Sequence, residues 1–154
     1  MKKSCVLILM LLVFATLKAQ ITKDPVLWTC KTVKMNDHKY KIYIEANIES
    51  GWHIYSQHQP KDAISTPTSF VIGPEKQIKA IGRMKEIGKV EKQDIETLGI
   101  TQNYFAKKVS FEQEFAVNNP RGNKVSIKIA YMACNDHSCL PVKEIEVQAV
   151  LPKN

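Results

Sequence analysis

Two of the four cysteines, Cys134 and Cys139, are separated by four residues in a short polar segment between two apolar-rich stretches. Apolar residues recur at every second position over residues 125–131 before the segment and over residues 145–151 after it. Period-two spacing is typical of half-buried β-strands, so the segment is predicted to be the tip of a β-hairpin. Opposite residues of an antiparallel pair lie about 4.5–5.5 Å apart at Cα, so the two cysteines can form a disulfide there.

Three kinds of chemistry are open to this pair. The first is a structural disulfide. Closing a loop of about six residues stabilises the folded state by only about 2 kcal/mol, against about 5 kcal/mol for a loop of about 100 residues. A metal site needs four ligands, and His137 with the two cysteines supplies three, so the fold would have to bring in Cys30. The tip of a hairpin suits a pair that opens, closes and meets the thiol of a partner, which favours redox exchange.

The first 19 residues have the composition of a secretory signal peptide. Lys2 and Lys3 precede an apolar run over residues 6–17, and Ala19 is a small residue at the expected cleavage point. The run is shorter than the about 20 residues of a transmembrane span. We therefore expect export to an oxidising compartment and no transmembrane segment in the mature chain. Cys5 leaves with the signal.

Residues 20–154 are expected to form a single domain with a sizeable core. Three of the 22 basic residues lie in the signal, so 19 remain against 15 acidic ones, a net charge of +4. The basic residues are scattered, which speaks against nucleic-acid binding. Among the three remaining cysteines, Cys30 shares a predicted strand face with Trp28, and it is interpreted as a buried, inert thiol.

The rest of the sequence predicts strands and no helix of more than two turns. The clearest strand covers residues 40–48, where apolar side chains alternate with polar ones. Other candidates cover residues 26–30, 52–56, 69–72, 77–81 and 109–117, with a turn at 118–122. Short strands separated by turn signals predict an all-β sandwich. The polar, lysine-rich residues 82–102 break this pattern and are predicted to be a long connection, either functional or a surface loop with an extra short strand.

Three segments together resemble a known family. Residues 51–57 (Gly-Trp-His-Ile-Tyr-Ser-Gln), 67–70 (Pro-Thr-Ser-Phe) and 131–141, which include the cysteine hairpin, are similar to the N-terminal periplasmic domain of the bacterial thiol:disulfide interchange protein DsbD. Trp28 and residues 105–111 fit the same family, so the similarity covers nearly the whole mature chain.

This resemblance implies an immunoglobulin-like β-sandwich of antiparallel strands whose cysteine pair passes electrons between thioredoxin-like proteins and periplasmic partners. Cys139 maps to the cysteine that exchanges with the partner, and Cys134 to the resolving one. A cap loop corresponds to roughly residues 94–99, with Leu98 at about the place of an aromatic residue that covers the sulfur atoms in other members. By the same resemblance, His53, Tyr55 and Asp94 are expected to line the site.

The resemblance implies protein-disulfide reductase or interchange activity without a cofactor or a metal. Because the sequence ends at Asn154, the electron donor is expected to be a separate membrane protein. Near the sulfur atoms, Asp136 would raise a thiol pKa by like-charge repulsion, whereas a protonated His137 would lower it.

Two hypotheses follow. The first is an exported exchange domain that uses Cys134 and Cys139, with an accessible and reducible bridge. The second is a secreted immunoglobulin-like binding module in which the disulfide is purely structural and the binding face lies elsewhere, for example on residues 82–102. A fold alone does not separate them. The position of the pair at a hairpin tip favours the first.

Overall fold

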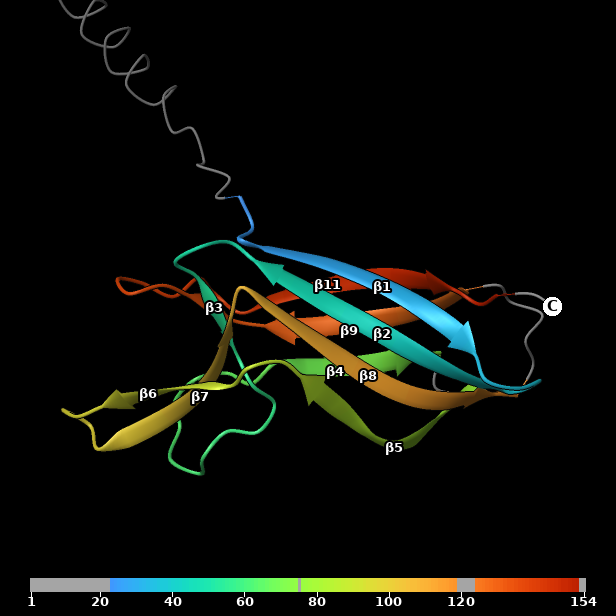
Figure 1. Cartoon of the computed structure of the whole chain (residues 1–154), viewed down its shortest axis with the longest axis horizontal. Helices are drawn as coiled ribbons and strands as arrows, with labels where there is room; N and C mark the ends of the chain where they lie inside the picture. The colour runs from blue at the N-terminus through green and yellow to red at the C-terminus, as the bar shows by residue number, and fades with distance from the viewer. Residues whose placement is uncertain (1–22, 75, 119–123, 153–154) are drawn as a thin grey trace, which may run out of the picture.

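The structure is a computed structural model that describes residues 23–74, 76–118 and 124–152. These described parts contain eleven strands and no helix (Figure 1). The strands are β1 (Val26–Lys34), β2 (Lys39–Ile48), β3 (His53–Tyr55), β4 (Ser69–Gly73), β5 (Ile78–Ile87), β6 (Glu91–Ile95), β7 (Ile100–Ala106), β8 (Lys108–Val117), β9 (Lys124–Tyr131), β10 (Ala133–Cys134) and β11 (Lys143–Val150). All their pairings are antiparallel, which confirms the predicted fold class.

Two predictions fall on parts of the chain that the structure does not describe. The signal peptide, residues 1–19, lies outside the described residues, and so does most of the predicted turn at 118–122. Within the described residues, no helix has the length and apolar character needed to cross a membrane.

The alternating sequence produces the central strands of the sandwich. In β2, the side chains of Tyr40, Ile42 and Ile44 are buried, while the residues between them are partly exposed. β8 shows the same alternation, and the register places Phe111 opposite Ile44 and Phe115 opposite Tyr40. Directly opposed side chains lie on the same face of a sheet, so both strands bury one continuous apolar face.

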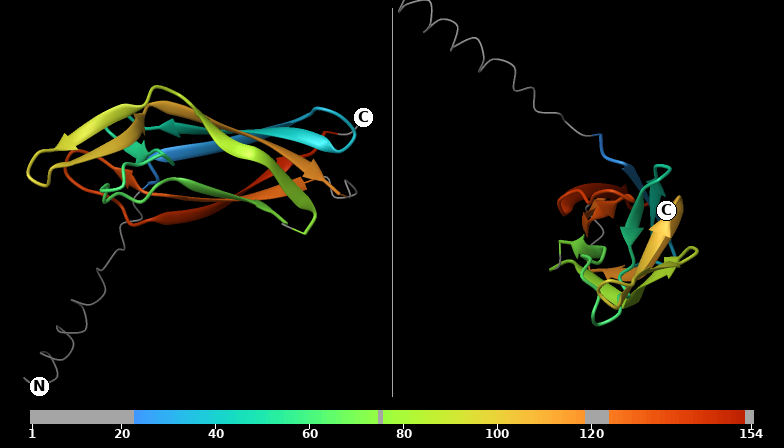
Figure 2. Two further views of the ribbon diagram at one scale, coloured as in Figure 1. Left: turned by 90° about the horizontal axis from the view of Figure 1, so that it is seen from below. Right: turned by 90° about the vertical axis from the view of Figure 1, so that its left-hand side faces the viewer.

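Two sheets enclose the main core. One has the strand order β1-β2-β8-β5 and the other β11-β9-β4, and the right-hand view of Figure 2 shows them on opposite sides of the molecule. Aromatic rings join them: Trp28 of β1 lies 5.2 Å from Tyr131 of β9 and 6.0 Å from Phe70 of β4, measured between ring centroids. Phe111 of β8 lies 4.6 Å from Phe70. Such aromatic contacts add to the free energy of simple burial.

A third, smaller sheet with the order β10-β3-β7-β6 extends the sandwich at one end, on the left of Figure 1. Two of its connections to the larger sheets are single residues. Lys107, with a φ of 66°, joins β7 to β8, and Met132 joins β9 to β10. The sheet therefore sits on the ends of core strands, and β10 carries the first cysteine of the hairpin into it.

Residues 82–102 are not the long connection that the sequence predicted. They form most of β5, all of β6 and the start of β7, with a register shift in β5 between Ile81 and Lys85. β5 and β6 are edge strands with many exposed side chains, several of them lysines. Charged edge strands are common in sheets, because they discourage pairing with other chains. Such strands lack the buried face that makes other strands recognisable in sequence.

Candidate functional site

Cys134 and Cys139 form a disulfide with an S–S distance of 2.02 Å and a Cα–Cα distance of 4.0 Å. Two backbone hydrogen bonds flank the pair, from the Leu140 N–H to the Ala133 carbonyl and from the Asn135 N–H to the Ser138 carbonyl. The cysteines therefore occupy a non-hydrogen-bonded position of an antiparallel pair. At such positions opposite Cα atoms approach most closely, to about 4.5 Å. The prediction that the cysteines face each other at a hairpin tip is confirmed.

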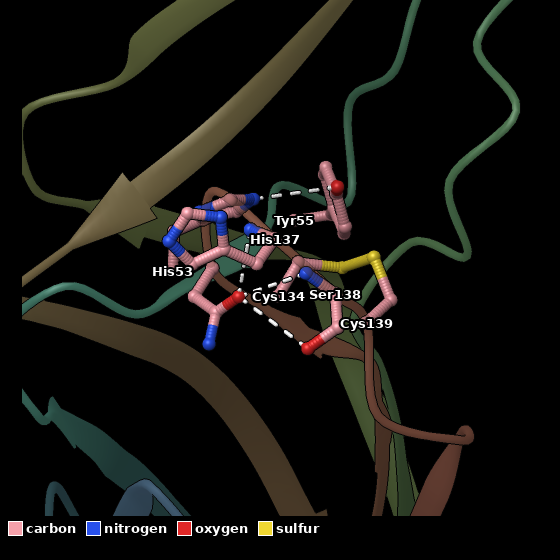
Figure 3. The surroundings of a disulfide bond; sticks show 7 residues. His53, Tyr55, Cys134, His137, Ser138 and Cys139 are labelled. Carbon is pink, nitrogen blue, oxygen red and sulfur yellow. Dashed lines mark hydrogen bonds between the residues drawn. A yellow bond between two sulfur atoms is a disulfide. The ribbon is translucent and has the colours of Figure 1, made fainter.

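The side chain of Asn135 fixes the turn between the two cysteines. Its Oδ1 accepts hydrogen bonds from the backbone N–H groups of His137 (2.9 Å) and Ser138 (2.8 Å), and it also lies 3.4 Å from the Ser138 hydroxyl (Figure 3). This arrangement is an Asx turn, in which a short polar side chain replaces backbone partners. Asp136 and His137 are thereby placed at the exposed tip.

The two sulfur-bearing residues differ in exposure. Cys134 is 1% exposed, whereas Cys139 is exposed to solvent. Thiol–disulfide exchange requires that the incoming thiolate reach one sulfur along the S–S bond, so access selects the sulfur that is attacked. Cys139 is therefore the more accessible residue of the pair, and Cys134 lies on the buried side.

The register of the small sheet determines which residues lie beside Cys134. Cys134 is opposite His53 of β3, and Tyr55, two residues further along β3, is opposite Tyr104 of β7. Since opposite residues and residues two apart share a face, these side chains point to the same side of the sheet. The intervening residue Ile54 is fully buried on the other face, in the core.

This face forms one wall of a cavity of about 430 Å³ beside the disulfide. The hairpin and the segment between β3 and β4 form the other walls. The lining residues are His53, Tyr55, Ile64, Ser65, Gln93, Ile95, Gln102, Met132, Cys134, Asn135, His137, Ser138 and Cys139. The cavity is thus a compartment next to the accessible sulfur, with one exposed apolar side chain, Ile64, at its border.

Burial sets the protonation states of His53 and Tyr55. The pKa of His53 is lowered because burial disfavours the imidazolium, an effect that the Asp136 carboxylate partly offsets. The pKa of Tyr55 is raised by burial, which disfavours the phenolate. The His53 Nε2 atom lies 3.3 Å from the Tyr55 hydroxyl, and Figure 3 shows this contact beside the disulfide. At neutral pH the cavity therefore holds a neutral imidazole next to a protonated phenol.

The structure brings together only part of the predicted site. Tyr55 and His137 line the cavity, and Asp136 is exposed at the tip of the turn. Asp94 lies on β6, where its carboxylate accepts a hydrogen bond from the Thr101 hydroxyl at 2.7 Å. Leu98 is 60% exposed in the turn between β6 and β7. Neither Asp94 nor Leu98 is among the residues that line the cavity.

Several lining residues were missed by the sequence analysis. Gln93 and Ile95, the neighbours of Asp94, face the cavity, and so does Gln102, which is opposite Gln93. Their alternation on β6 could have identified them only if residues 91–95 had been recognised as a strand. Ser65 lies in the segment between β3 and β4, where no periodicity indicates which side chains point inward.

The structure places Cys30 away from this site. It lies on β1 in the four-stranded sheet of the main sandwich, and its thiol is 3.4 Å from the Gln148 carbonyl oxygen. Cys30 was predicted to be buried but is only half-buried, and this partial burial raises the pKa of its thiol, which favours the unreactive, protonated form. The fourth ligand that a metal site at the hairpin would need is thus on another sheet. Among the described residues, no group of three or more His, Cys, Asp or Glu side chains is arranged to hold a metal ion.

A family model described as "Thiol:disulfide interchange protein DsbD, N-terminal" matches residues 25–151. A comparison with curated protein sequences found no match. Among solved structures, the reduced N-terminal domain of DsbD from Neisseria meningitidis has a TM-score of 0.52 and 14% identity, over 84% of this chain and 90% of that one. The N-terminal periplasmic domain of ScsB from Proteus mirabilis has a TM-score of 0.54 and 14% identity, over 82% of this chain and 45% of that one.

A similar fold also occurs in a yeast protein domain. The yeast GGA1 GAE domain has a TM-score of 0.50 and 11% identity, over 87% of this chain and 96% of that one. Structural similarity at such low sequence identity shows the fold alone, and it confirms the predicted immunoglobulin-like β-sandwich. The family model carries more information, because it spans most of the sequence and includes both cysteines of the hairpin. The chain belongs to the family of DsbD N-terminal domains.

Proposed function

We propose that this chain is a thiol–disulfide exchange domain that passes electrons through Cys134 and Cys139, to or from thioredoxin-like partners. The observation that carries the proposal is a disulfide at the tip of a short hairpin, in which Cys139 is exposed and both cysteines line a cavity of about 430 Å³. Membership of the DsbD N-terminal domain family supports it.

Energetics also favour exchange over a structural role. Closing this short loop stabilises the fold by only about 2 kcal/mol in the chain-entropy model. Most of the buried core comes from side chains of the two large sheets, and neither cysteine of the bridge belongs to those sheets. The bridge is therefore a small contributor to stability, and its opening leaves most of the fold intact.

Exchange proceeds in two steps that conserve atoms and electrons. A thiolate of a dithiol partner attacks the Cys139 sulfur, the S–S bond breaks, and Cys134 leaves as a thiolate. A second thiolate of the partner then attacks the mixed disulfide and releases Cys139. Two electrons move from the partner to this chain, and the reverse sequence passes them on to a second partner that carries a disulfide.

We place this exchange in the periplasm, an oxidising compartment in which disulfides persist. The support is the family and the composition of residues 1–19. The partners in the proposal are thioredoxin-like proteins, and the electron donor belongs to a separate membrane protein. Which of the two directions of electron flow operates in the cell is decided by the potentials of those partners.

The equilibrium reduction potential of the Cys134–Cys139 bridge tests the proposal. The chain without residues 1–19 is equilibrated in glutathione or dithiothreitol buffers, and free thiols are trapped and counted. We expect a potential between about −180 and −270 mV, the range of known exchange proteins. A potential below about −300 mV would place the bridge among structural disulfides and would reject the proposal.

That second outcome would support a binding module with a structural disulfide. The observation that favours this alternative is the shared fold of the yeast GGA1 GAE domain, since sandwiches serve many functions. Under this alternative, Cys139 is expected not to react with the thiols of a partner. Measuring the potential and the reactivity of Cys139 in the same preparation separates the two functions.

A further inference from the structure

The imidazole of His53 lies beside the buried cysteine, Cys134. His53 is 8% exposed, lies opposite Cys134 in the β10–β3 pair, and lines the same cavity as both sulfur atoms. A buried titratable side chain with a hydrogen-bonding contact to a second one, next to a reactive bond, calls for an explanation. The exchange steps of the proposed function involve only the cysteines and the thiols of the partner, and they assign no role to His53.

Exchange requires a proton to be moved at Cys134. A thiol is inert as a nucleophile until it is deprotonated, and burial disfavours the thiolate. When the reduced domain passes on its electrons, exposed Cys139 attacks first, and Cys134 must then lose its proton to resolve the mixed disulfide. Since Cys134 is only 1% exposed, bulk water is a poor acceptor for this proton.

The cavity offers few groups that can accept it. Apart from the cysteines, the titratable side chains that line it are His53, Tyr55 and His137, and no carboxylate or amine is among the lining residues that the structure describes. His137 is exposed at the tip of the turn. His53 is on the buried side, and its Nε2 atom lies 3.3 Å from the Tyr55 hydroxyl.

We propose that Tyr55 and His53 form a proton relay for Cys134, in which the Tyr55 oxygen takes the thiol proton while its own proton passes to His53 Nε2. The Cys134 thiolate then attacks the Cys139 sulfur of the mixed disulfide, and the thiolate of the partner leaves. Two electrons reach the partner, and the proton remains on the imidazolium until it is released to solvent. In the opposite direction the same relay returns a proton to Cys134 when the bridge is reduced.

Other groups around His53 are compatible with this role. Its ring contacts Tyr55 on its own strand (centroid distance 5.3 Å) and Tyr104 on β7 (4.7 Å). Glu91 of β6 accepts a hydrogen bond from the Tyr104 hydroxyl at 3.2 Å. The negative charge of Asp136 in the hairpin turn raises the pKa of His53, which partly offsets the effect of burial. The lowered pKa of His53 keeps the ring neutral at neutral pH, the form that accepts a proton. Asp136 stabilises the imidazolium once it has formed.

The inference rests on the proposed function, and a two-phase reaction tests them separately. The reduced domain, with Cys30 replaced by Ser, is mixed with one equivalent of 4,4′-dithiodipyridine, and the release of thiopyridone is followed by stopped-flow absorbance. The first phase, whose rate depends on probe concentration, reports the attack by Cys139. The second phase, independent of probe concentration, reports resolution by Cys134.

We expect His53→Gln and Tyr55→Phe each to slow the second phase by about 100-fold, the lower end of the range for general acid–base catalysis, and to leave the first phase unchanged. In the wild type the second phase should be nearly independent of pH above the lowered pKa of His53 and should fall below it. In His53→Gln it should instead rise with pH throughout, because hydroxide becomes the base. Added imidazole should restore the rate of a His53→Ala variant.

His38→Gln is the matched control, since His38 is exposed in the β1–β2 turn of the main sandwich and does not line the cavity. An unchanged first phase in His53→Gln shows that Cys139 keeps the reactivity that it has in the wild type. If the wild type shows no second phase, the exchange function itself is rejected. If the second phase of His53→Gln keeps the rate and pH profile of the wild type, the relay is overturned and the exchange function stands.

Discussion

At the residue scale, the two cysteines have the same chemistry and differ in their surroundings. Cys139 is exposed, whereas Cys134 lies among buried side chains at the end of β10. The rate of thiol–disulfide exchange depends on thiolate fraction and on access, and burial lowers both. The difference in position therefore supports the proposed division into an attacked cysteine, Cys139, and a resolving cysteine, Cys134.

Serine substitutions should make this division visible. With Cys30 also replaced by Ser, Cys134→Ser keeps the exposed thiol and should form a mixed disulfide with oxidised glutathione quickly. Cys139→Ser keeps the buried thiol and should react about tenfold more slowly, if exposing it costs about 1.4 kcal/mol. Mass spectrometry of trapped samples measures both rates. A faster reaction of Cys139→Ser would reverse the assignment of the two roles.

At the scale of the element, the hairpin turn holds the cysteines at bridging distance. Two backbone N–H groups donate to the Asn135 side chain, each bond contributing about 1 kcal/mol. This preorganisation raises the effective concentration of one thiol for the other. We expect Asn135→Ala to weaken the bridge by about 1–2 kcal/mol, which raises the reduction potential by about 20–40 mV.

Asn135→Asp is the matched control for that turn, because it keeps an acceptor oxygen at the same position. Its potential should lie closer to that of the wild type than the potential of Asn135→Ala does. Equilibration of all three proteins in the same dithiothreitol buffers gives the comparison. Equal potentials for the wild type and Asn135→Ala would mean that the backbone holds the turn without the side chain.

A second element contact ties the start of β1 to the base of the hairpin. The Asp24 carboxylate accepts hydrogen bonds from the Tyr131 hydroxyl and from Lys143 Nζ, the latter at 2.7 Å. Burial alone would raise the pKa of Asp24, but these bonds outweigh it, so the pKa is lowered from its ordinary value of 3.8. The ionised carboxylate thus stabilises the folded state.

Asp24→Asn should therefore destabilise the domain by about 1–2 kcal/mol at pH 7, a value reduced for partial exposure. The lowered pKa means that the stabilisation is fully present above about pH 3.8 and is lost as pH falls through the folded-state pKa. Urea unfolding of both proteins at pH 7 and pH 3 measures the difference. A difference that is larger at pH 3 would contradict the assigned direction.

Sequence reasoning recovered the elements that bury one face and missed those that do not. The alternation over residues 40–48 identified β2, and the same pattern identified β9 and β11 around the cysteines. β6 has no such pattern, because it is an edge strand with mostly exposed side chains. Gln93 and Ile95 could not be assigned to the cavity for this reason, whereas the disulfide, encoded by spacing between two alternating strands, could.

At the scale of the whole molecule, the cysteine site lies on the small sheet at one end of the sandwich, and the main core lies between the two large sheets. The cavity is built on one face of the small sheet, and the other face of that sheet adds Ile54 and Phe105 to the core. Phe115 is fully buried on β8 and stacks on Tyr40 at a centroid distance of 5.8 Å. Phe115 is eight residue steps along the strand from Lys107, which joins β8 to β7 of the small sheet, and this corresponds to about 27 Å at 3.4 Å per residue.

This separation predicts that stability and redox potential change independently. Phe115→Leu should lower the free energy of unfolding by about 1–2 kcal/mol, since it removes buried volume from the core. The potential depends on the difference between oxidised and reduced folded forms, and a remote core residue stabilises both equally, so we expect a shift of less than about 10 mV. Urea unfolding and dithiothreitol equilibration of the same variant provide both numbers. A shift of about 20–40 mV, the full equivalent of the lost stability, would mean that the core and the hairpin respond to reduction as one unit.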